Sequence, residues 1–262
     1  MVRENIADVI CIGAQKTSTS WLHHVLNVHP DMYVFPNSKP ITSTNKEAHF
    51  WDRNHDRGVD WYRELMTPDV PTKRSMDFTP EYAFLSQKQI EECKALNPTA
   101  RIIYVLRDPL SRAVSALRME TKRATNDADP AEYVIRYSDE TLALIEKAQI
   151  NDHGSYVANH ARWSRAYDDI LVLNYEDILS EPRAVIRRIF GYLDLDEGKM
   201  TDEHRAQFET RFEKKVWKSL EYALDRELMY FLHGLMMPKR QAAEAKFGFR
   251  FTEYRQTLGM VV

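Results

Sequence analysis

The sequence predicts an α/β fold in which helices flank a mainly parallel β-sheet. Short apolar runs rich in Val, Ile and aromatic residues are typical of strands buried on both faces. These runs alternate with segments of helical periodicity, as in parallel sheets with helical crossovers. The chain has 262 residues and is 44% hydrophobic, which suffices for one large core. Since no linker or repeat is visible, we expect a single domain over 1–262, with a motif-bearing core at 8–195 and a mainly helical part at 196–262.

The strands are predicted from the apolar runs in chain order. The runs that predict strands are Asp8–Ala14, Arg74–Phe78, Arg101–Arg107 and Asp169–Asn174, with Met32–Phe35 as a weaker fifth. Helical periodicity predicts helices at Thr19–Val28, Ser86–Leu96, Leu110–Arg123, Ala131–Gln149, Gly154–Tyr167, Pro182–Leu193 and Glu203–Leu235. Asp108 followed by Pro109 is a strong helix start, because it combines a capping residue with proline at the first helical position.

Composition excludes some classes of function. A formal net charge of −3 argues against nucleic-acid binding, although it leaves room for a local basic pocket. Cys11 and Cys93 form neither a metal nor a disulfide pattern, which fits a reducing compartment. The first residues lack the apolar region of a signal peptide, and no run reaches the ~20 apolar residues of a membrane span. We therefore expect a cytoplasmic protein, whose oligomeric state the sequence leaves open.

Residues 9–22 (VICIGAQKTSTSWL) predict a pocket for a phosphate-like anion. An apolar strand leads to a glycine turn, and a lysine and four hydroxyl residues then open a helix whose N-terminal N–H groups attract anions. Walker-type nucleotide binding is weakly supported, because Lys16 follows Gly13 by three positions instead of six. Alternatively, the hydroxyls only cap the helix. The predicted anion-binding residues are Gly13, Lys16, Thr17, Ser18, Thr19 and Ser20.

Residues 104–118 (YVLRDPLSRAVSALR) predict a second anion contact. Arg107 ends a strand and can reach the same crevice as Lys16, where its planar fork suits a second phosphate. Ser111 and Ser115 are four residues apart and share a face of the next helix. The alternative role for Arg107 is a structural ion pair with a nearby aspartate, Asp108 or Asp77.

Four segments together resemble sulfotransferases that use 3′-phosphoadenosine 5′-phosphosulfate (PAPS). GAQKTSTSWL is similar to their 5′-phosphosulfate loop, and YVLRDPLSRAVSAL to their 3′-phosphate segment. KEAHFWD resembles the catalytic Glu-x-His stretch of the heparan-sulfate type, and the segment from GSYVANHARW to NYEDILSEP matches a later family pattern. Their order implies a P-loop-NTPase-like sulfotransferase fold, with PAPS as donor co-substrate, adenosine 3′,5′-bisphosphate (PAP) as product, and no metal.

The resemblance also implies roles for single residues. Glu47 is the expected general base, Lys16 stabilises the leaving phosphate, and His49 assists by polarising the sulfuryl oxygens or orienting the acceptor. Arg107 and Ser115 are expected to hold the 3′-phosphate. Tyr175 either touches the nucleotide or is a core residue. Without the motif order, Glu47 would be interpreted as a solvated surface carboxylate and His49 as a packed neighbour of Phe50.

Three departures from the family pattern bear on the donor and the acceptor. Phe78 stands where the heparan-sulfate branch has a lysine before Thr-Pro, which removes an expected cationic contact. The insertion PNSKPITSTN before Lys46 indicates a different acceptor. The basic loop over the adenine is not recognisable, and Lys214, Lys215 and Lys218 fit a solvated helix face better.

Asp77 and Glu81 are candidate acceptor-side carboxylates. The aromatic residues Phe50, Trp51, Trp61, Tyr62 and Tyr82 suit ring stacking but fit a core better.

Three hypotheses follow for function. The leading one is sulfuryl transfer from PAPS to an acceptor hydroxyl, on a carbohydrate or a small molecule. A P-loop-type kinase of small metabolites shares the strand–loop–helix anion site. A non-catalytic nucleotide-binding relative is the third, and it is favoured by Phe78 and the unclear adenine loop.

Overall fold

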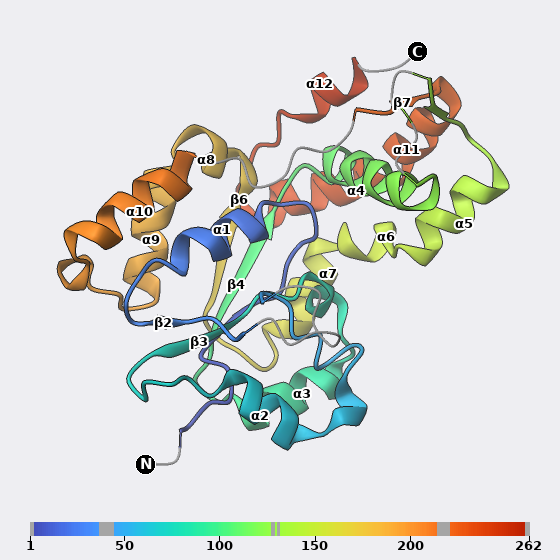
Figure 1. The fold of residues 1–262 in the computed structure, drawn as a ribbon. Helices are drawn as coiled ribbons and strands as arrows, with labels where there is room; N and C mark the ends of the chain where they lie inside the picture. Colours follow the sequence, from blue (N-terminus) through green and yellow to red (C-terminus); the bar gives the residue numbers. More distant parts are fainter. Residues whose placement is uncertain (1–2, 37–44, 127–128, 130–131, 214–220, 260–262) are drawn as a thin grey trace.

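The computed structural model describes residues 3–36, 45–126, 129, 132–213 and 221–259, and a five-stranded parallel sheet forms its centre (Figure 1). The strands are β1 (Val9–Cys11), β2 (Met32–Tyr33), β3 (Arg74–Asp77), β4 (Arg101–Leu106) and β6 (Ile170–Asn174), in the order β2-β3-β1-β4-β6. Val9 pairs in parallel register with Met76 on one side and with Arg101 on the other. The predicted parallel sheet is confirmed, including its weaker fifth strand at β2.

Helices cover both faces of this sheet (Figure 1). Val9 and Cys11 of β1 pack in a core cluster with residues of α1 (Thr19–Leu26) and α9 (Pro182–Tyr192), near α8 (Tyr175–Ser180) and α10 (Asp202–Glu213). Ile10 and Ile12 belong to the opposite cluster, with α2 (Val59–Met66), α3 (Gln87–Leu96) and α7 (Tyr156–Trp163). Successive strand residues point to opposite faces, so burial of both faces explains the continuous apolar runs.

A third apolar cluster lies at one end of the molecule, around the helix that follows β4. It combines α4 (Pro109–Ala124), α5 (Asp139–Lys147), α6 (Ile150–His153) and α11 (Arg226–Phe247) with the small parallel sheet of β5 (Val134–Ile135) and β7 (Ala223–Leu224). The short helix α12 (Tyr254–Leu258) packs beside α4, and 3-10 turns lie at η1 (His55–Arg57), η2 (Pro80–Phe84) and η3 (Glu197–Lys199). No helix in the described ranges is long and apolar enough to cross a membrane.

Two predicted helices differ from the structure. The single helix over Ala131–Gln149 is wrong, because β5 occupies part of it and Ser138 caps the shorter α5 by accepting from the Thr141 N–H. The single helix over Glu203–Leu235 is wrong as well. The chain forms α10, then β7, and Asp225 caps a new helix, α11, that continues to Phe247. In both segments, a cap and a strand pairing outweigh a continuous helical periodicity.

Candidate active site

Gly13 turns the chain from β1 into the predicted anion loop. Its φ of +117° is a conformation that favours glycine, and a Cβ built at this position would lie 2.7 Å from the carbonyl oxygen of Pro80. The loop is tied to the sheet at its base, where the Ala14 N–H donates to the carbonyl of Val105 at 2.9 Å. The glycine is therefore required for close packing of the loop against the exit of β3.

The hydroxyl residues of the loop differ in what their side chains do. The Thr17 hydroxyl donates to the carbonyl of Ala14 at 2.6 Å, so it closes the loop itself. Ser18 is the N-cap of α1, and within the described part of the chain its side chain makes no capping hydrogen bond. Thr19 and Ser20 form the first turn of α1. Simple helix capping thus does not account for the serine, and the positive end of α1 lacks a side-chain cap.

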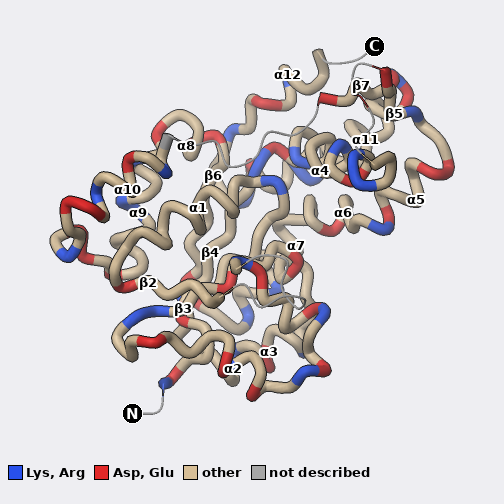
Figure 2. Tube along the Cα trace, viewed as in Figure 1, with Lys and Arg blue, Asp and Glu red and all other residues tan. Residues whose placement is uncertain are grey.

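Lys16 lies in the loop that leads into α1, and basic positions gather along α4 (Figure 2). Its Nζ is 3.9 Å from the Met119 Sδ of α4. Burial, and then the charges of Arg107 and Arg123, lower the pKa of Lys16 to about 8. This crowding of positive charge is what an anionic ligand would relieve, because a bound anion favours the protonated lysine.

Arg107 extends from the end of β4 to the back of the loop. Its Nη1 donates to the carbonyl of Lys16 at 2.9 Å, and its guanidinium lies 4.5 Å from the ring centroid of Tyr175. It also forms a two-pronged ion pair with Glu253, in which Nε donates to Oε2 at 2.8 Å. Arg107 therefore has an acidic partner, as the structural alternative predicts, but that partner is Glu253 and not Asp108 or Asp77. Ser115 lies buried on α4.

Glu47 and His49 form the second half of the site. The Glu47 carboxylate forms an ion pair with Lys46, and its Oε2 lies 3.4 Å from His49 Nε2. Burial raises the pKa of Glu47, but the hydrogen bond with His49 and the charge of Lys46 outweigh it and lower the pKa to about 2. His49 Nδ1 lies 2.9 Å from Asp52 Oδ2. Burial lowers the pKa of His49, yet the hydrogen bonds to Asp52 and Glu47 raise it to about 10. Glu47 is thus ionised and His49 protonated at neutral pH.

Asp77 at the end of β3 holds this segment in place. Its Oδ1 accepts from the Ala48 N–H at 3.2 Å and from the Thr79 hydroxyl at 2.6 Å, and its Oδ2 accepts from the hydroxyls of Tyr62 and Tyr82. Asp77 is fully buried. Its suggested place on the acceptor side is therefore wrong, because every contact faces the protein interior. This network supports the residues of the site.

The aromatic residues near His49 are core residues, as predicted. Phe50 and Tyr62 stack with ring centroids 4.5 Å apart, and Trp51 and Tyr82 are buried beside them. Phe78 is also fully buried, with its ring 5.3 Å from that of His23. Among the aromatic residues proposed for stacking, Phe50, Trp51, Tyr62 and Tyr82 are thus enclosed in the core, whereas Trp61 is partly buried.

Three side chains of the site come together as a potential metal-binding group, which sequence spacing does not reveal. Ligand atoms of His49, Asp52 and Glu81 lie within 4.8 Å of one another. His49 Nδ1 is engaged by Asp52, and the imidazole is protonated at neutral pH. Because a metal binds the neutral imidazole, a cation here would have to displace a proton that two carboxylates stabilise. The geometry thus favours a proton at His49.

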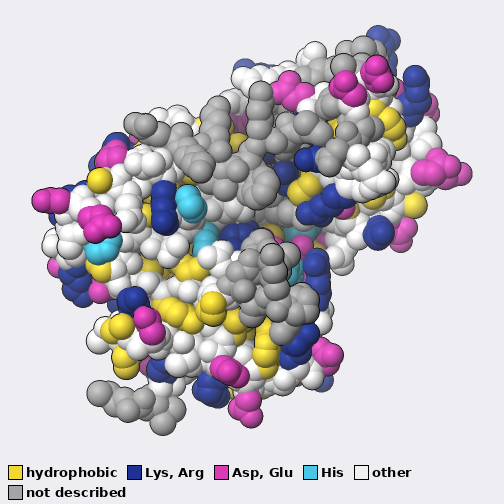
Figure 3. Space-filling model, viewed as in Figure 1, with side chains coloured by type: hydrophobic (Ala, Val, Ile, Leu, Met, Phe, Trp, Pro, Cys, Tyr) yellow, Lys and Arg dark blue, Asp and Glu magenta, His cyan; other side chains and the backbone are white. Residues whose placement is uncertain are grey.

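The two halves of the site meet at the exit of β3. The His49 N–H donates to the Thr79 hydroxyl at 3.2 Å, and the next residue, Pro80, packs against Gly13 of the anion loop. On the viewed face, histidines and basic side chains gather around α1 in the middle of the molecule (Figure 3). An anion on the loop would therefore lie at the same edge of the sheet as Glu47 and His49.

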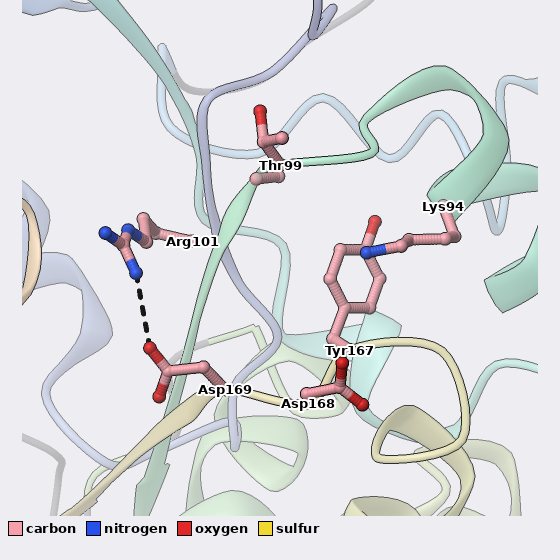
Figure 4. Close-up of a pocket in the computed structure, with 7 residues that line it drawn as sticks. Lys94, Thr99, Arg101, Tyr167, Asp168 and Asp169 are labelled. Carbon is pink, nitrogen blue, oxygen red and sulfur yellow. Dashed lines mark hydrogen bonds and ion pairs between the residues drawn. The ribbon is translucent and has the colours of Figure 1, made fainter.

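A shallow pocket of about 360 Å³ lies at the opposite end of the strands, where β4 and β6 begin (Figure 4). It is lined by Lys94, Thr99, Ala100, Arg101, Tyr167, Asp168 and Asp169. Arg101 pairs with Asp169 at 3.2 Å, and Lys94 donates to the carbonyl of Pro98. Ligands of parallel sheets bind beyond the carboxyl ends of the strands, so this pocket is not the candidate active site.

Sequence reasoning missed three contributors to the site. Asp52 follows His49 by three residues, a spacing that signals a possible contact once His49 is singled out. Lys46 adjoins Glu47 in the same motif. Glu253 has no local signal, because its partner Arg107 is 146 residues away in the chain. Two features named in the sequence analysis lie outside the described residues. They are most of the PNSKPITSTN insertion and the lysines expected on a solvated helix face, Lys214, Lys215 and Lys218.

Comparisons with known proteins agree on one family. The family model described as "Sulfotransferase domain" matches residues 7–242. Human heparan sulfate glucosamine 3-O-sulfotransferase 3B1 is 27% identical over 204 residues, which cover 77% of this chain and 49% of the relative. Human bifunctional heparan sulfate N-deacetylase/N-sulfotransferase 1 is 29% identical over 199 residues, covering 71% of this chain and 22% of that protein. The chain thus spans about half the length of the first relative and less of the second.

Solved structures show the same fold. A sulfotransferase from Alicyclobacillus acidocaldarius aligns with a TM-score of 0.68 at 20% identity, covering 97% of this chain and 100% of that chain. Sulfotransferase STF9 from Mycobacterium avium aligns with a TM-score of 0.61 at 15% identity, covering 95% of this chain and 79% of that chain. The sheet and its flanking helices therefore form a sulfotransferase fold of the P-loop-like kind.

Proposed function

Because the chain belongs to the sulfotransferase family, we propose that it transfers a sulfuryl group from PAPS to an acceptor hydroxyl. One observation carries the proposal beyond the family. An ionised carboxylate, Glu47, and an anion loop, residues 13–20, are both built on the exit of β3 through Thr79 and Pro80. A base and an anion site at one sheet edge are what transfer from an anionic donor requires.

In the proposed complex, the N-terminal N–H groups of α1 hold the 5′-phosphosulfate, with Thr19 and Ser20 beside them. Lys16 neutralises the charge that develops on the leaving phosphate, since burial among cations makes an anion its natural partner. Arg107 and Ser115 hold the 3′-phosphate, and Tyr175 supports Arg107 from the face of its ring. The contact between Arg107 and Glu253 changes when this phosphate binds.

The proposed reaction is an in-line displacement at sulfur. The acceptor oxygen attacks the sulfur, the bond from sulfur to the 5′-phosphate oxygen breaks, and PAP leaves with the bonding electron pair. Glu47 accepts the proton of the acceptor hydroxyl. His49 is held by Asp52 and protonated, so it directs positive charge toward the sulfuryl oxygens and keeps Glu47 oriented. The reaction needs no metal in this scheme.

We propose a carbohydrate hydroxyl as the acceptor, with a small molecule as the second candidate. The first relative is named for heparan sulfate glucosamine and the second for heparan sulfate, and both names refer to a carbohydrate. The family model covers the Glu47 segment, whereas the match to the first relative covers 49% of that protein, so the acceptor is inferred from the shared part alone. An aminosugar nitrogen is less favoured, because a protonated amine has no lone pair at neutral pH and Glu47, with its low pKa, is a weak base for it.

Calorimetric titration with PAP, ATP and AMP tests the donor. We expect PAP to bind more tightly than either ATP or AMP, because Arg107 and Ser115 recognise the 3′-phosphate. ATP binding equal to that of PAP, together with Mg²⁺-dependent hydrolysis, would instead support the kinase alternative.

Glu47→Gln separates an enzyme from a non-catalytic relative. It should lower sulfuryl transfer to a panel of saccharide acceptors by about 10²–10⁴-fold, the usual contribution of a general base. PAP affinity should stay within about twofold, because a neutral amide in place of the carboxylate is no worse a neighbour for an anionic ligand. A wild-type protein that binds PAP but transfers sulfate to no acceptor would support the binding relative.

A further inference from the structure

Lys46 is a buried lysine that the proposed reaction leaves without a role. Its side chain is 8% exposed, and it pairs with the Glu47 carboxylate. Its Nζ also donates to the Thr19 hydroxyl of the anion loop at 3.4 Å. We propose that Lys46 is a second donor-site cation, which contacts the sulfuryl group of the bound donor between the anion loop and Glu47. This inference rests on the proposed function.

The location of Lys46 follows from the backbone. The Phe78 N–H donates to the Lys46 carbonyl at 2.9 Å, which anchors this residue beside the end of β3. From there the side chain extends toward the first turn of α1, where it reaches Thr19. The ammonium therefore contacts both halves of the site, through the Thr19 hydroxyl in one half and the Glu47 carboxylate in the other. A surface lysine would not be held this way, because its chain entropy would favour solvent.

The geometry of transfer places the sulfur next to this ammonium. The leaving phosphate lies on the anion loop, and the acceptor oxygen lies beside Glu47, so an in-line attack puts the sulfur between them. Lys46 Nζ contacts Thr19, on the side of the leaving phosphate, and Glu47, on the side of the acceptor. A cation in that position faces the sulfuryl oxygens, where negative charge must be compensated in a site of low dielectric.

Phe78 strengthens this assignment. Its side chain, at the exit of β3, is apolar and fully buried against His23. The backbone hydrogen bond between the two residues makes Lys46 its neighbour. Lys46 thus brings positive charge to the edge of the site where Phe78 provides none.

The test compares two ligands that differ in the sulfuryl group. PAPS and PAP are titrated calorimetrically, without acceptor, into the wild type and Lys46→Met. We expect Lys46→Met to weaken PAPS binding about tenfold or more and PAP binding by less than about threefold, since only PAPS carries the contacted group. The matched control is Lys94→Met, in the pocket of Figure 4, which should leave both affinities unchanged.

A double variant separates direct contact from charge compensation. Lys46 could favour PAPS only by neutralising Glu47, and then the penalty of Lys46→Met would vanish in a Glu47→Gln background. Persistence of the penalty in that background supports contact, and its disappearance overturns the proposal. Urea unfolding checks that each variant folds. If Lys46→Met does not fold, Lys46→Gln keeps a donor for Thr19 and should show the same selective loss of PAPS binding.

Failure of this inference is distinguishable from failure of the proposed function. A wild-type protein that binds neither PAP nor PAPS refutes the function itself. Tight wild-type binding of both ligands, with equal losses in Lys46→Met, refutes only the role of Lys46.

Discussion

Glu253→Gln should strengthen PAP binding. Glu253 pairs with the guanidinium of Arg107, the group proposed to hold the 3′-phosphate. The two carboxylate oxygens of Glu253 accept hydrogen bonds from Nε and Nη2 of Arg107, and the carbonyl of Lys16 accepts one from Nη1. Arg107 has five N–H groups, so two are left. A phosphate must therefore displace Glu253 or bind next to its carboxylate, and either event costs free energy that the neutral variant does not incur.

The size of the effect follows from burial and charge. The two side chains are 14% and 19% exposed, so the pair lies neither in bulk water nor in a dry core. Two unit charges 4 Å apart attract by about 4 kcal/mol at an effective dielectric of ~20. The amide of the variant keeps a neutral hydrogen bond of about 1 kcal/mol, and solvent screens part of the remainder. A gain of about 1.5–3 kcal/mol remains, which is roughly a 10–100-fold increase in PAP affinity.

Isothermal titration calorimetry of PAP and AMP measures this gain. AMP lacks the 3′-phosphate, so its affinity should change by less than about threefold. In an Arg107→Ala background the gain of Glu253→Gln should vanish, and Glu227→Gln, at an exposed position of α11, is the matched control. Unchanged or weaker PAP binding by Glu253→Gln would refute the reasoning, because it would mean that the carboxylate does not oppose the 3′-phosphate.

Three further predictions concern the framework of the site. Gly13→Ala should destabilise the fold by about 2 kcal/mol or more in urea unfolding, because the new Cβ would lie 2.7 Å from the carbonyl oxygen of Pro80 and because the φ of residue 13 is positive. Gly191→Ala is the control and should not destabilise the fold, because a Cβ there would meet nothing within 4 Å. Asp77→Ala should cost about 3 kcal/mol or more, since it leaves buried hydroxyls unpaired, whereas the exposed Asp69→Ala should cost less than about 0.5 kcal/mol. The pKa of His49 is raised in the folded state, so its stabilisation is complete below about pH 6.5 and is lost as the pH rises toward 10. The stability difference between wild type and His49→Gln should therefore shrink over that interval, and a difference that grew with pH would contradict the assigned protonation.

The sheet could be predicted because its strands are buried on both faces. Arg101–Leu106 reads as a continuous apolar run after its first residue, and burial on both faces is the physical reason for that run. The tail could not be predicted, because helical periodicity continues through positions where Asp225 starts a new helix. Local periodicity carries no information about a strand such as β7, which forms only when it pairs with β5, about 90 residues earlier in the chain.

The site is predictable where its chemistry is local and not where it depends on distant contacts. Glu47 and His49 are two residues apart, and the structure brings them within 3.4 Å. Sequence reasoning names a nearby aspartate as the partner of Arg107, because it searches the neighbourhood first. A long-range partner such as Glu253 has no periodic or spacing signal, and only the folded chain identifies it.

The contacts of the C-terminal segment, residues 251–258, have a consequence for the order of folding. Glu253 joins Arg107 across 146 residues, and Thr252 joins Glu176 across 76, while Glu47, His49 and Asp52 meet within one short stretch. Closing a long loop costs more chain entropy than closing a short one, so we expect the C-terminal segment to dock late and detach first. Native-state hydrogen exchange should then show the amides of Thr252 and Glu253 opening at lower free energy than those of β4. A detachment of this kind frees Arg107 while the segment carrying Glu47 stays folded.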